Sequence, residues 1–539
     1  MMRGPLDAED SRSLRTGFLS SVARYPERLA LTVDGENFTY AELDTRARRI
    51  AGLIVDRLGF AASRVGIFAS RSIEAYTGTL AAMYAGAAFV PLNRRFTVAR
   101  TAAMIRRSRL DAIIVDAGSA PQLHDVLAGV EKPLLLIVPD GAAFEIARTL
   151  DHNASGEDDL RTAPPLHELP PMVPDDIAYL LFTSGTTGEP KGVGVCHSNV
   201  VHYLDVVAAR YDLGPNDRCS QLFDQTFDLS VHDLFATWGA GASLHVPRPI
   251  DTLAPVRFVN FRELTSWFSV PSAAALAFKK GMLKVGSMPS LRLSLFCGEP
   301  LPAALADAWQ TAAGNSRVEN LYGPTELTIA CFSYHWRADV SPQESVQGIV
   351  PIGRPFPGLA ALLVDDALEP VGEGQRGELL VCGPQTTPGY WSDEERTRER
   401  FVTLPVADTV EKLFYRTGDR VERLPTGNYA FIGRTDNQIK LLGFRVELGE
   451  IEAVLLKGEG VGQAAALGWP IVDGSAQRVV AFVSGRGVNV DALRSAARTE
   501  LPDYMVPERF IMIEDFPVNA NGKIDRRELA LWLEQGTLE

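Results

Sequence analysis

Cysteine is scarce in this sequence. Only five occur among 539 residues, at scattered positions: Cys196, Cys219, Cys297, Cys331 and Cys382. Their number is odd, no two are spaced as CxxC, and the eight histidines do not cluster with them. We therefore expect neither a disulfide framework nor a structural zinc site. Few, unpaired cysteines are typical of a reducing compartment, so we expect a cytoplasmic protein.

Net positive charge and long hydrophobic runs are also missing. The formal net charge is −14, whereas proteins that bind nucleic acids in general need a cationic surface. No apolar run reaches the ~18 residues that a membrane-spanning helix requires. The first residues, MMRGPLDAEDSRS, are polar and acidic, unlike a signal peptide. We expect neither nucleic acid nor a membrane among the partners.

The chain is too long for one hydrophobic core, so we expect at least two lobes. Hydrophobic residues make up 46% and charged residues 22%, an ordinary globular balance. In the first half, predicted strands at 64–69, 88–92 and 111–116 alternate with predicted helices at 72–87 and 98–110. This alternation predicts an α/β fold whose mostly parallel sheets are covered by helices.

The pattern changes near Asp436, where a polar turn leads into a strand, another turn and an amphipathic helix. From there we predict a small α+β unit, with helices at 448–457 and 490–500 and strands near 463–468, 478–484 and 509–514. We place the boundary at this residue. The prediction is a large N-terminal lobe, 1–435, and a small C-terminal lobe, 436–539.

A stretch rich in glycine and hydroxyl groups, TSGTTGEPKG at 183–192, follows a predicted buried strand. Glycine lets the backbone approach a ligand closely. Hydroxyls and backbone N–H groups in such a turn can donate to phosphate oxygens. The GxxxxGK[ST] pattern of a Walker A loop is absent. These residues alone leave two alternatives open, a phosphate-binding loop or a mobile surface turn.

The stretch resembles the phosphate loop of the adenylate-forming superfamily, which contains acyl- and aryl-CoA ligases, luciferases and nonribosomal peptide adenylation domains. Further motifs follow in the family's order: FDLSVHDLF (227–235), NLYGPTE (320–326), YRTGDR (415–420), GRTDNQIKLLGFRVELGEIE (433–452) and NANGKIDR (519–526). The resemblance covers roughly residues 28 to 530. It implies ATP and Mg²⁺ as cofactors, with attack of a substrate carboxylate on the α-phosphorus.

The resemblance also assigns residues to the nucleotide. Those implied to bind ATP are Thr183, Ser184, Gly185, Thr186, Thr187, Gly188, Lys191, Asn320, Tyr322, Gly323, Thr325, Asp419 and Arg434. Glu326 is the implied Mg²⁺ ligand, and Thr183, Lys191, Glu326 and Lys523 are the implied catalytic residues. Outside this motif context, Glu326 would be an ordinary surface or capping acid, and Asp419 and Arg434 members of surface ion pairs.

Lys523 belongs to the small lobe, whereas the phosphate loop belongs to the large one. In the family this lysine bridges the substrate carboxylate and the nucleotide, so the small lobe must be mobile, with Asp436 as the hinge. After rotation, the segment QIKLLGFRVE should face the active site beside a tunnel for a pantetheine arm, and Gly443 should permit close approach of that arm. Without the motif, Lys523 would be a solvated turn lysine.

The acid that is activated should be a small amino acid. In the family, an acid at the position of Asp228 pairs with the substrate α-ammonium; the alternative is a helix N-cap. The implied pocket contains Asp228, Leu229, His232, Phe268, Leu295, Cys297, Gly298, Leu321, Ile329 and Ala330. The placement of Phe268 could slip by one position within TSWFSVPS.

The pocket lining favours proline, then alanine or another small residue. Beyond Asp228 it carries no formal charge, which argues against charged side chains, and its bulky members leave little space. It most resembles the lining of stand-alone prolyl-carrier-protein ligases, from which His232 and Ala330 depart. His232 is either a donor to a polar substrate atom or a pocket histidine satisfied by the protein.

We expect the acceptor to be a separate phosphopantetheinylated carrier protein, because neither an Asp-Ser pantetheinylation motif nor HHxxxD is present. Arg445 and the segment DRREL (525–529) are candidate docking residues. Two alternatives remain. An acyl- or aryl-CoA ligase would use free coenzyme A but would have no use for Asp228. A non-catalytic sensor would be expected to lack Lys523, Asp419 or Glu326, and all three are present.

Overall fold

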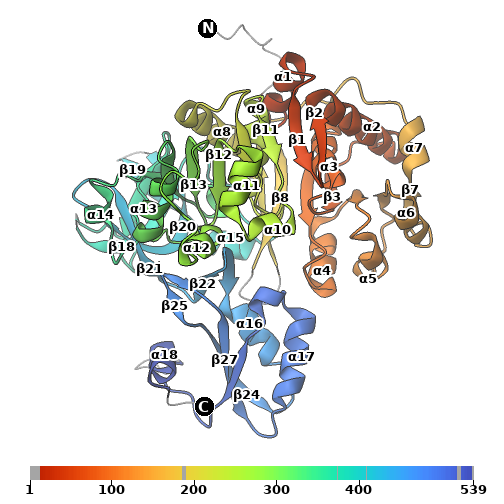
Figure 1. Ribbon diagram of the computed structural model, residues 1–539. Helices are drawn as coiled ribbons and strands as arrows, with labels where there is room; N and C mark the ends of the chain where they lie inside the picture. The colour runs from red at the N-terminus through yellow and green to blue at the C-terminus, as the bar shows by residue number, and fades with distance from the viewer. Residues whose placement is uncertain (1–11, 185–189, 373, 408–409, 519–523, 537–539) are drawn as a thin grey trace.

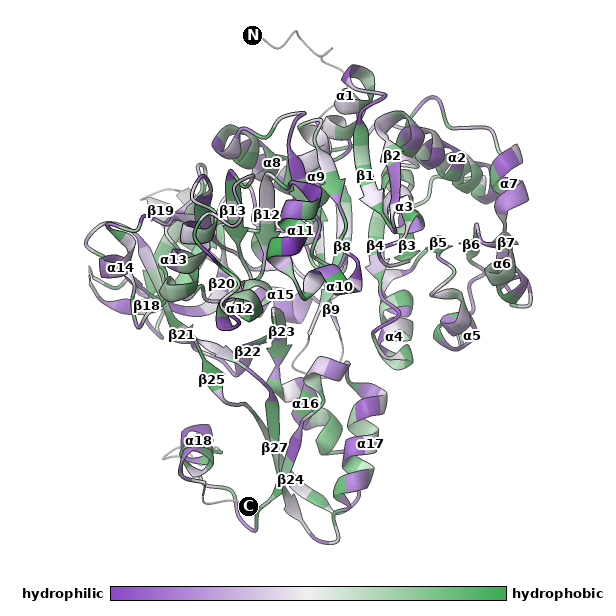
Figure 2. Cartoon of the chain, viewed as in Figure 1, coloured by the Kyte–Doolittle hydropathy of each residue, from purple (hydrophilic) through white to green (hydrophobic). Residues whose placement is uncertain are grey.

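The structure, a computed structural model, describes residues 12–184, 190–372, 374–407, 410–518 and 524–536. Figure 1 shows a large lobe of several sheets and helices, with a smaller lobe below it that begins at β22. Figure 2 shows hydrophobic residues along the central strands, whereas helices such as α17 carry both hydrophilic and hydrophobic residues. Among the described helices, none combines the length and the apolar content that a membrane span requires.

A seven-stranded sheet forms the first half of the large lobe. Its order is β7 (Asn153–Ser155), β6 (Leu135–Ile137), β5 (Ala112–Val115), β3 (Arg64–Phe68), β4 (Ala88–Leu92), β8 (Ile177–Thr183) and β9 (Lys191–Cys196). All neighbours are parallel except β8 and β9. Helices α3 (Ile73–Tyr84) and α4 (Val98–Ser108) connect the strands that the sequence predicted. Strand β5 is buried along its whole length, as expected for a sheet covered on both faces.

A nine-stranded sheet forms the second half. Its order is β16 (Arg354–Pro355), β15 (Phe332–His335), β14 (Arg317–Tyr322), β13 (Leu293–Phe296), β12 (Ser266–Ser269), β10 (Arg218–Ser220), β11 (Ser243–His245), β1 (Leu29–Val33) and β2 (Glu36–Thr39). The central strands are parallel. Residues of α2 (Tyr40–Leu58), α3, α8 (His197–Tyr211) and α9 (Leu229–Gly239) join both sheets in the largest hydrophobic cluster.

A third sheet of the large lobe is antiparallel, and the sequence did not predict it. It contains β17 (Ala360–Val364), β18 (Arg376–Cys382), β19 (Phe401–Ala407), β20 (Val410–Arg423) and β21 (Tyr429–Arg434). The remaining helices of this lobe are α1 (Thr16–Arg24), α5 (Leu123–Val126), α6 (Gly141–Ala147), α7 (Glu157–Thr162), α10 (Pro249–Thr252), α11 (Pro255–Arg262), α12 (Pro271–Lys279), α13 (Ala303–Ala312), α14 (Ser341–Glu344) and α15 (Glu394–Arg400). Short 3₁₀ turns lie at Ala120–Gln122 and Thr325–Leu327.

The small lobe has the predicted α+β character. One sheet pairs β23 (Phe444–Glu447), β22 (Gln438–Leu441), β26 (Ser475–Ala476) and β25 (Ile471–Val472). The other pairs β24 (Val461–Gly468), β27 (Val479–Gly485) and β28 (Arg509–Met512). Helices α16 (Leu448–Leu455) and α17 (Val490–Glu500) lie where the sequence predicted them, whereas α18 (Arg526–Gln535) and the 3₁₀ turn Asp503–Met505 were not predicted. The α/β fold with a large and a small lobe is therefore confirmed.

Candidate active site

The ends of several strands of the large lobe converge on two adjoining cavities. The first cavity is bordered by Asn320, Tyr322, Asp419 and Arg434. The second is bordered by Thr183, Ser184, Asp228 and Cys297. Gly298, Gly323, Pro324, Lys440 and Arg445 border both. Two cavities that share a wall suit a reaction in which two ligands meet.

The first cavity contains an ionic network on two antiparallel strands. Asp419 on β20 lies opposite Arg434 on β21, so their side chains are neighbours. Arg434 donates to Asp419 Oδ1 at 2.5 Å, and the Tyr322 hydroxyl donates to Oδ2 at 2.5 Å. Burial, followed by the Asp419 charge, raises the pKa of Tyr322 well above its usual value. Three of the residues that the motifs assign to ATP, Tyr322, Asp419 and Arg434, therefore lie in direct contact.

Asn320 provides a test of whether this cavity suits a nucleotide base. Its amide Nδ2 donates to the backbone carbonyl of Pro351 at 2.9 Å. Its Oδ1 is buried and has no hydrogen-bond partner among the described residues. An unpaired buried acceptor beside a cavity suits an exocyclic amino group, such as that of adenine. The residues present therefore fit the ATP implied by the motifs.

Glu326 is fully buried at the end of the turn that follows β14. Gly323 permits this turn, because a Cβ there would lie 2.5 Å from Ala330 Cα. Arg445 pairs with Glu326 Oε2 at 3.0 Å, and the Tyr390 hydroxyl donates to Oε1 at 2.7 Å. Burial raises the pKa of Glu326, but Arg445 and Lys191 outweigh it and lower the pKa to about 2. Glu326 is therefore a carboxylate.

Glu326 would be a lone protein ligand for a metal. Within the described ranges, no group of three or more His, Cys, Asp or Glu side chains could hold a metal ion. Mg²⁺ typically binds through one or two carboxylates together with substrate phosphates and waters, so a single carboxylate fits that ion. The Mg²⁺ role of Glu326 stays a prediction from the motif.

The two ends of the phosphate loop lie on paired strands. Thr183 ends β8 and Lys191 begins β9, and the two residues are register partners. The Thr183 hydroxyl is buried without a partner among the described residues. Burial is the main cause that lowers the pKa of Lys191 to about 8. The other predicted loop residues, Gly185, Thr186, Thr187 and Gly188, lie outside the described residues.

The β22–β23 hairpin of the small lobe lies against these groups. Glu447 Oε1 is 3.2 Å from Lys191 Nζ, with both side chains buried. The Ser184 hydroxyl donates to the backbone carbonyl of Arg445 at 2.8 Å. The prediction that the segment QIKLLGFRVE faces the site is therefore confirmed. Gly443 has φ +87°, and a Cβ there would lie 3.0 Å from the Val270 side chain, so this turn requires glycine.

The prediction that Arg445 docks a carrier protein is wrong. Its side chain is only 14% exposed, because it points inward to Glu326. A docking residue must be reachable from solvent. In the other candidate segment, Asp525 caps α18 and Arg526 pairs with Glu452 at 2.6 Å, whereas Arg527 is exposed. Docking through residues 525–529 stays a prediction.

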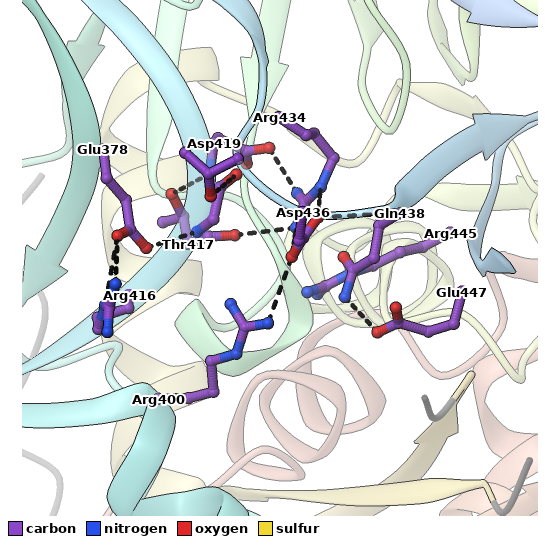
Figure 3. Close-up of polar contacts among 12 residues, drawn as sticks. Glu378, Arg400, Arg416, Thr417, Asp419, Arg434, Asp436, Gln438, Arg445 and Glu447 are labelled. Atoms are coloured by element: carbon purple, nitrogen blue, oxygen red, sulfur yellow. Dashed lines mark hydrogen bonds and ion pairs between the residues drawn. The ribbon is translucent and has the colours of Figure 1, made fainter. Parts of the chain in front are cut away.

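Asp436 is fixed by ionic contacts at the junction of the lobes. Figure 3 shows Arg434 between Asp419 and Asp436. Arg434 donates to both Asp436 oxygens, at 2.7 and 2.8 Å, and Arg400 donates at 3.3 Å. Burial raises the pKa of Asp436, but Arg434 outweighs it and lowers the pKa to about 2. The hinge role and the boundary at this residue stay predictions.

Asp228 is a buried acid at the wall of the second cavity. Its Oδ2 accepts a hydrogen bond from the Ile329 backbone N–H at 3.1 Å. It precedes α9 but makes no capping hydrogen bond with its side chain, so the helix-cap alternative is wrong. Burial raises its pKa to about 7, although its hydrogen bonds and Lys440 oppose the shift. A cationic ligand would therefore stabilise the carboxylate.

The predicted pocket walls are tightly packed. Phe268 contacts His232 edge to face, with ring centroids 4.7 Å apart, so the placement of Phe268 needs no shift. The Tyr203 hydroxyl is 2.8 Å from His232 Nδ1, which satisfies one ring nitrogen, and burial lowers the pKa of His232 to about 3. The other predicted wall residues in the large hydrophobic cluster are Leu229, Leu295, Cys297, Leu321, Ile329 and Ala330. Of the predicted wall residues, Asp228, Leu229, Cys297 and Gly298 border the second cavity, whereas neither of the two cavities is bordered by His232, Phe268, Leu295, Ile329 or Ala330.

Lys523 lies outside the described residues, but its neighbours are placed. Val518 and Ile524 form a β-bridge, and α18 follows. Figure 1 shows α18 on the part of the small lobe remote from the large lobe. The sequence missed a different lysine, Lys440 on β22, which borders both cavities and whose pKa is lowered, chiefly by burial. Its position in QIKL, on the same strand face as Gln438, was the available signal.

Comparison with known proteins gives matches over most of the chain. The family described as AMP-binding enzyme matches residues 18–391, and AMP-binding enzyme C-terminal domain matches residues 450–523. Tyrocidine synthase 2 of Brevibacillus parabrevis is 33% identical over 94% of this chain, and Novobiocin biosynthesis protein H of Streptomyces niveus is 32% identical over 98%. The chain spans 13% of the former protein and 84% of the latter.

Other curated relatives are also much longer than this chain, which spans between 6% and 21% of three of them. Among solved structures, the adenylation domain AlmE of Vibrio cholerae, in complex with glycyl-adenosine-5'-phosphate, has a TM-score of 0.85. It is 31% identical, and the match covers 98% of this chain and 99% of AlmE.

Proposed function

The chain belongs to the AMP-binding enzyme family, and we propose that it activates a small amino acid with ATP and passes it to the thiol of a separate carrier protein. The enzyme is an adenylate-forming, amino acid-activating ligase. Proline is the preferred substrate, with alanine or another small residue next. The assignment as an amino acid-activating ligase rests on the family match and on the relatives. The preference for proline rests on the predicted pocket.

One observation carries the choice of an amino acid. Asp228 is buried, and the protein supplies it with hydrogen bonds but no direct ion pair among the described residues. Burial raises its pKa to about 7, although hydrogen bonds and Lys440 partly offset the rise, and a substrate ammonium at this carboxylate would lower the pKa. An acyl- or aryl-CoA ligase has no amine to offer, so this carboxylate argues against that alternative.

In the first step, Asp228 binds the ammonium and orients the carboxylate toward the shared wall of the cavities. An oxygen of that carboxylate attacks the α-phosphorus, and the bond to pyrophosphate breaks. Lys191 and Thr183 lie at the ends of the loop that would hold the leaving phosphates. Mg²⁺ held by Glu326 would neutralise charge on those phosphates. Lys523 supplies the remaining cation from the small lobe.

The lobe arrangement in the structure supports a role in the second step. Lys191 is paired with Glu447, and Glu326 with Arg445, so both charges already have partners from the small lobe. Phosphates and metal would have to compete with these pairs. We infer that this arrangement follows pyrophosphate release. Lys440, at the wall between the cavities, then provides positive charge near the aminoacyl adenylate.

The small size of the substrate follows from the packing. Phe268, Leu295 and Ile329 are buried in the main hydrophobic cluster rather than spread around an open chamber. The solved relative AlmE was crystallised with a glycyl adenylate, which is also small. Neutral His232 offers no counter-charge for an acidic side chain.

Amino acid-dependent exchange of pyrophosphate into ATP tests the proposal. The panel should contain the standard amino acids and small non-standard ones, with propionate and cyclopentanecarboxylate as controls that lack the amine. We expect proline to exchange fastest and alanine next. Preference for a charged or aromatic amino acid would show that the pocket assignment is wrong. If none of the amino acids in the panel supports exchange, amino acid activation is rejected.

A further inference from the structure

Arg100 lies where the large lobe meets the small lobe, and the proposed function gives it no role. It belongs to α4, and its side chain, only 5% exposed, borders the second cavity. One terminal nitrogen, NH1, donates to Glu450 Oε1 of the small lobe at 2.6 Å. The Glu450 side chain is 3% exposed. The guanidinium is therefore held by a carboxylate on α16 in this lobe arrangement.

The other two nitrogens of this guanidinium are not paired with the described residues. Nε is enclosed by protein and has no hydrogen-bond partner there. The second terminal nitrogen, NH2, also has no acceptor there, but it is not fully enclosed. Because Arg100 borders the cavity and NH2 is its terminal nitrogen without an acceptor among the described residues, we infer that NH2 is the donor available to a ligand there. A buried charged donor without an acceptor is unfavourable, so a ligand acceptor would be favoured at this point.

Aromatic side chains from both lobes form the neighbouring wall. Phe444 of the small lobe contacts Phe227 edge to face, with centroids 5.0 Å apart. Tyr504 stacks on Phe444 at 3.7 Å, and Arg100 lies over the Phe96 ring at 5.4 Å from its centroid. This aromatic wall beside the Arg100 guanidinium suits an extended chain of methylene and amide groups. A compact charged ligand would instead need several polar partners.

We propose that Arg100 donates through NH2 to the second amide carbonyl, counted from the thiol, of the pantetheine-type arm that accepts the aminoacyl group. This inference rests on the proposed function. Asp228 and Cys297, which belong to the predicted amino acid pocket, border the same cavity as Phe96, Arg100 and Tyr504. The thiol must reach the amino acid, and the second amide lies farther from the thiol than the first, so we assign the second amide to Arg100.

Arg100 is a positioning residue and takes no part in the bond changes. During transfer, the thiol sulfur bonds to the acyl carbon while the bond from that carbon to the AMP oxygen breaks. AMP leaves with the electron pair, and the thiol proton goes to solvent. The small lobe supplies Glu450, Phe444 and Tyr504 to the same site, so the arm is recognised only in this arrangement.

Arg100→Lys tests the proposal, because lysine keeps the charge opposite Glu450 but lacks the second terminal nitrogen of the guanidinium fork. Thioester formation is measured with pantetheine, which has both amides, and with N-acetylcysteamine, which has only the first. We expect the KM for pantetheine to rise about tenfold, as for loss of one charge-assisted hydrogen bond, and the KM for N-acetylcysteamine to change less than about twofold. An equal change for both thiols, or none for either, overturns the proposal.

A binding measurement separates recognition from turnover. Titration calorimetry with dethiopantetheine, which cannot react, is performed on the AMP-saturated enzyme, and Arg100→Lys should weaken binding about tenfold. Arg106→Lys, at an exposed position on the same helix, is the matched control and should bind as the wild type does. Equal affinities of the wild type and Arg100→Lys would reject the contact.

Glu450→Gln provides a second variant if Arg100→Lys folds poorly. It keeps an acceptor for NH1 but loosens the guanidinium, so the KM for pantetheine should rise several-fold and that for N-acetylcysteamine should not. Failure of the proposed function can be distinguished from failure of the Arg100 contact. If the wild type shows no amino acid-dependent exchange, the proposed function fails. If the wild type exchanges and forms both thioesters but the variants keep its thiol preference, only the role of Arg100 fails.

Discussion

Substitution of Asp228 by asparagine tests the basis of amino acid selection. Asparagine has nearly the same shape, and its Oδ1 can still accept the hydrogen bond that the Ile329 N–H donates at 3.1 Å. The fold should therefore tolerate the change. What disappears is the negative charge opposite the substrate ammonium, which would then be buried without a counter-ion.

The magnitude follows from the burial of this site. Removing one partner of a buried ion pair costs about 3–5 kcal/mol, because the other charge is left uncompensated. Asp228 is only 7% exposed, so little of this cost is recovered from water. The cost corresponds to a loss of roughly two to three and a half orders of magnitude in kcat/KM for the amino acid. The KM for ATP should change little.

The assay is pyrophosphate exchange at about pH 8, where a carboxylate with a pKa of about 7 is mostly ionised in the wild type. Cyclopentanecarboxylate serves as the matched substrate that lacks the amine of proline. The substitution should lower exchange with proline but not with this analogue. A variant that loses both activities equally, or that keeps full activity with proline, would refute the ammonium contact.

Three further predictions test other parts of the mechanism. The KM for the amino acid should be nearly constant above about pH 7 and rise about tenfold for each unit below it, because protonation of Asp228, with its pKa of about 7, removes the binding charge; a KM independent of pH between about 5 and 8 would contradict this. Glu447→Gln removes the counter-ion of Lys191 in the observed lobe arrangement, so thioester formation should slow about tenfold or more while pyrophosphate exchange is retained. If the variant loses pyrophosphate exchange but keeps thioester formation, this lobe arrangement does not act in the second step. Lys523→Ala should nearly abolish adenylate formation in an exchange assay but spare thioester formation from supplied adenylate, and equal damage to both steps would exclude its assigned role.

The parts of the fold that the sequence predicted correctly have strong local patterns. Strand β5 is a continuous apolar run, and α17 begins at Val490 as the periodicity indicated. The motif residues were found because the stretches that contain them resemble those of the adenylate-forming superfamily. Two of them, Thr183 and Tyr322, lie at the ends of β8 and β14.

The parts that the sequence did not predict depend on contacts between distant segments. Arg100 and Glu450 are 350 positions apart, and neither residue type nor local pattern indicates that they pair. Arg445 was a candidate docking residue because an acidic carrier protein would need a basic patch, but Arg445 points inward and pairs with Glu326, 119 positions earlier. The antiparallel third sheet was missed because its strands do not alternate regularly with helices; only α15 lies between two of them, β18 and β19.

The most direct test of the account is a crystal structure of the enzyme with a non-hydrolysable prolyl adenylate analogue. The account predicts the proline nitrogen about 3 Å from an Asp228 carboxylate oxygen, with the adenine in the cavity bordered by Asn320 and Tyr322. An analogue bound with its nitrogen remote from Asp228, or a carboxylate turned away from the ligand, would contradict the central claim.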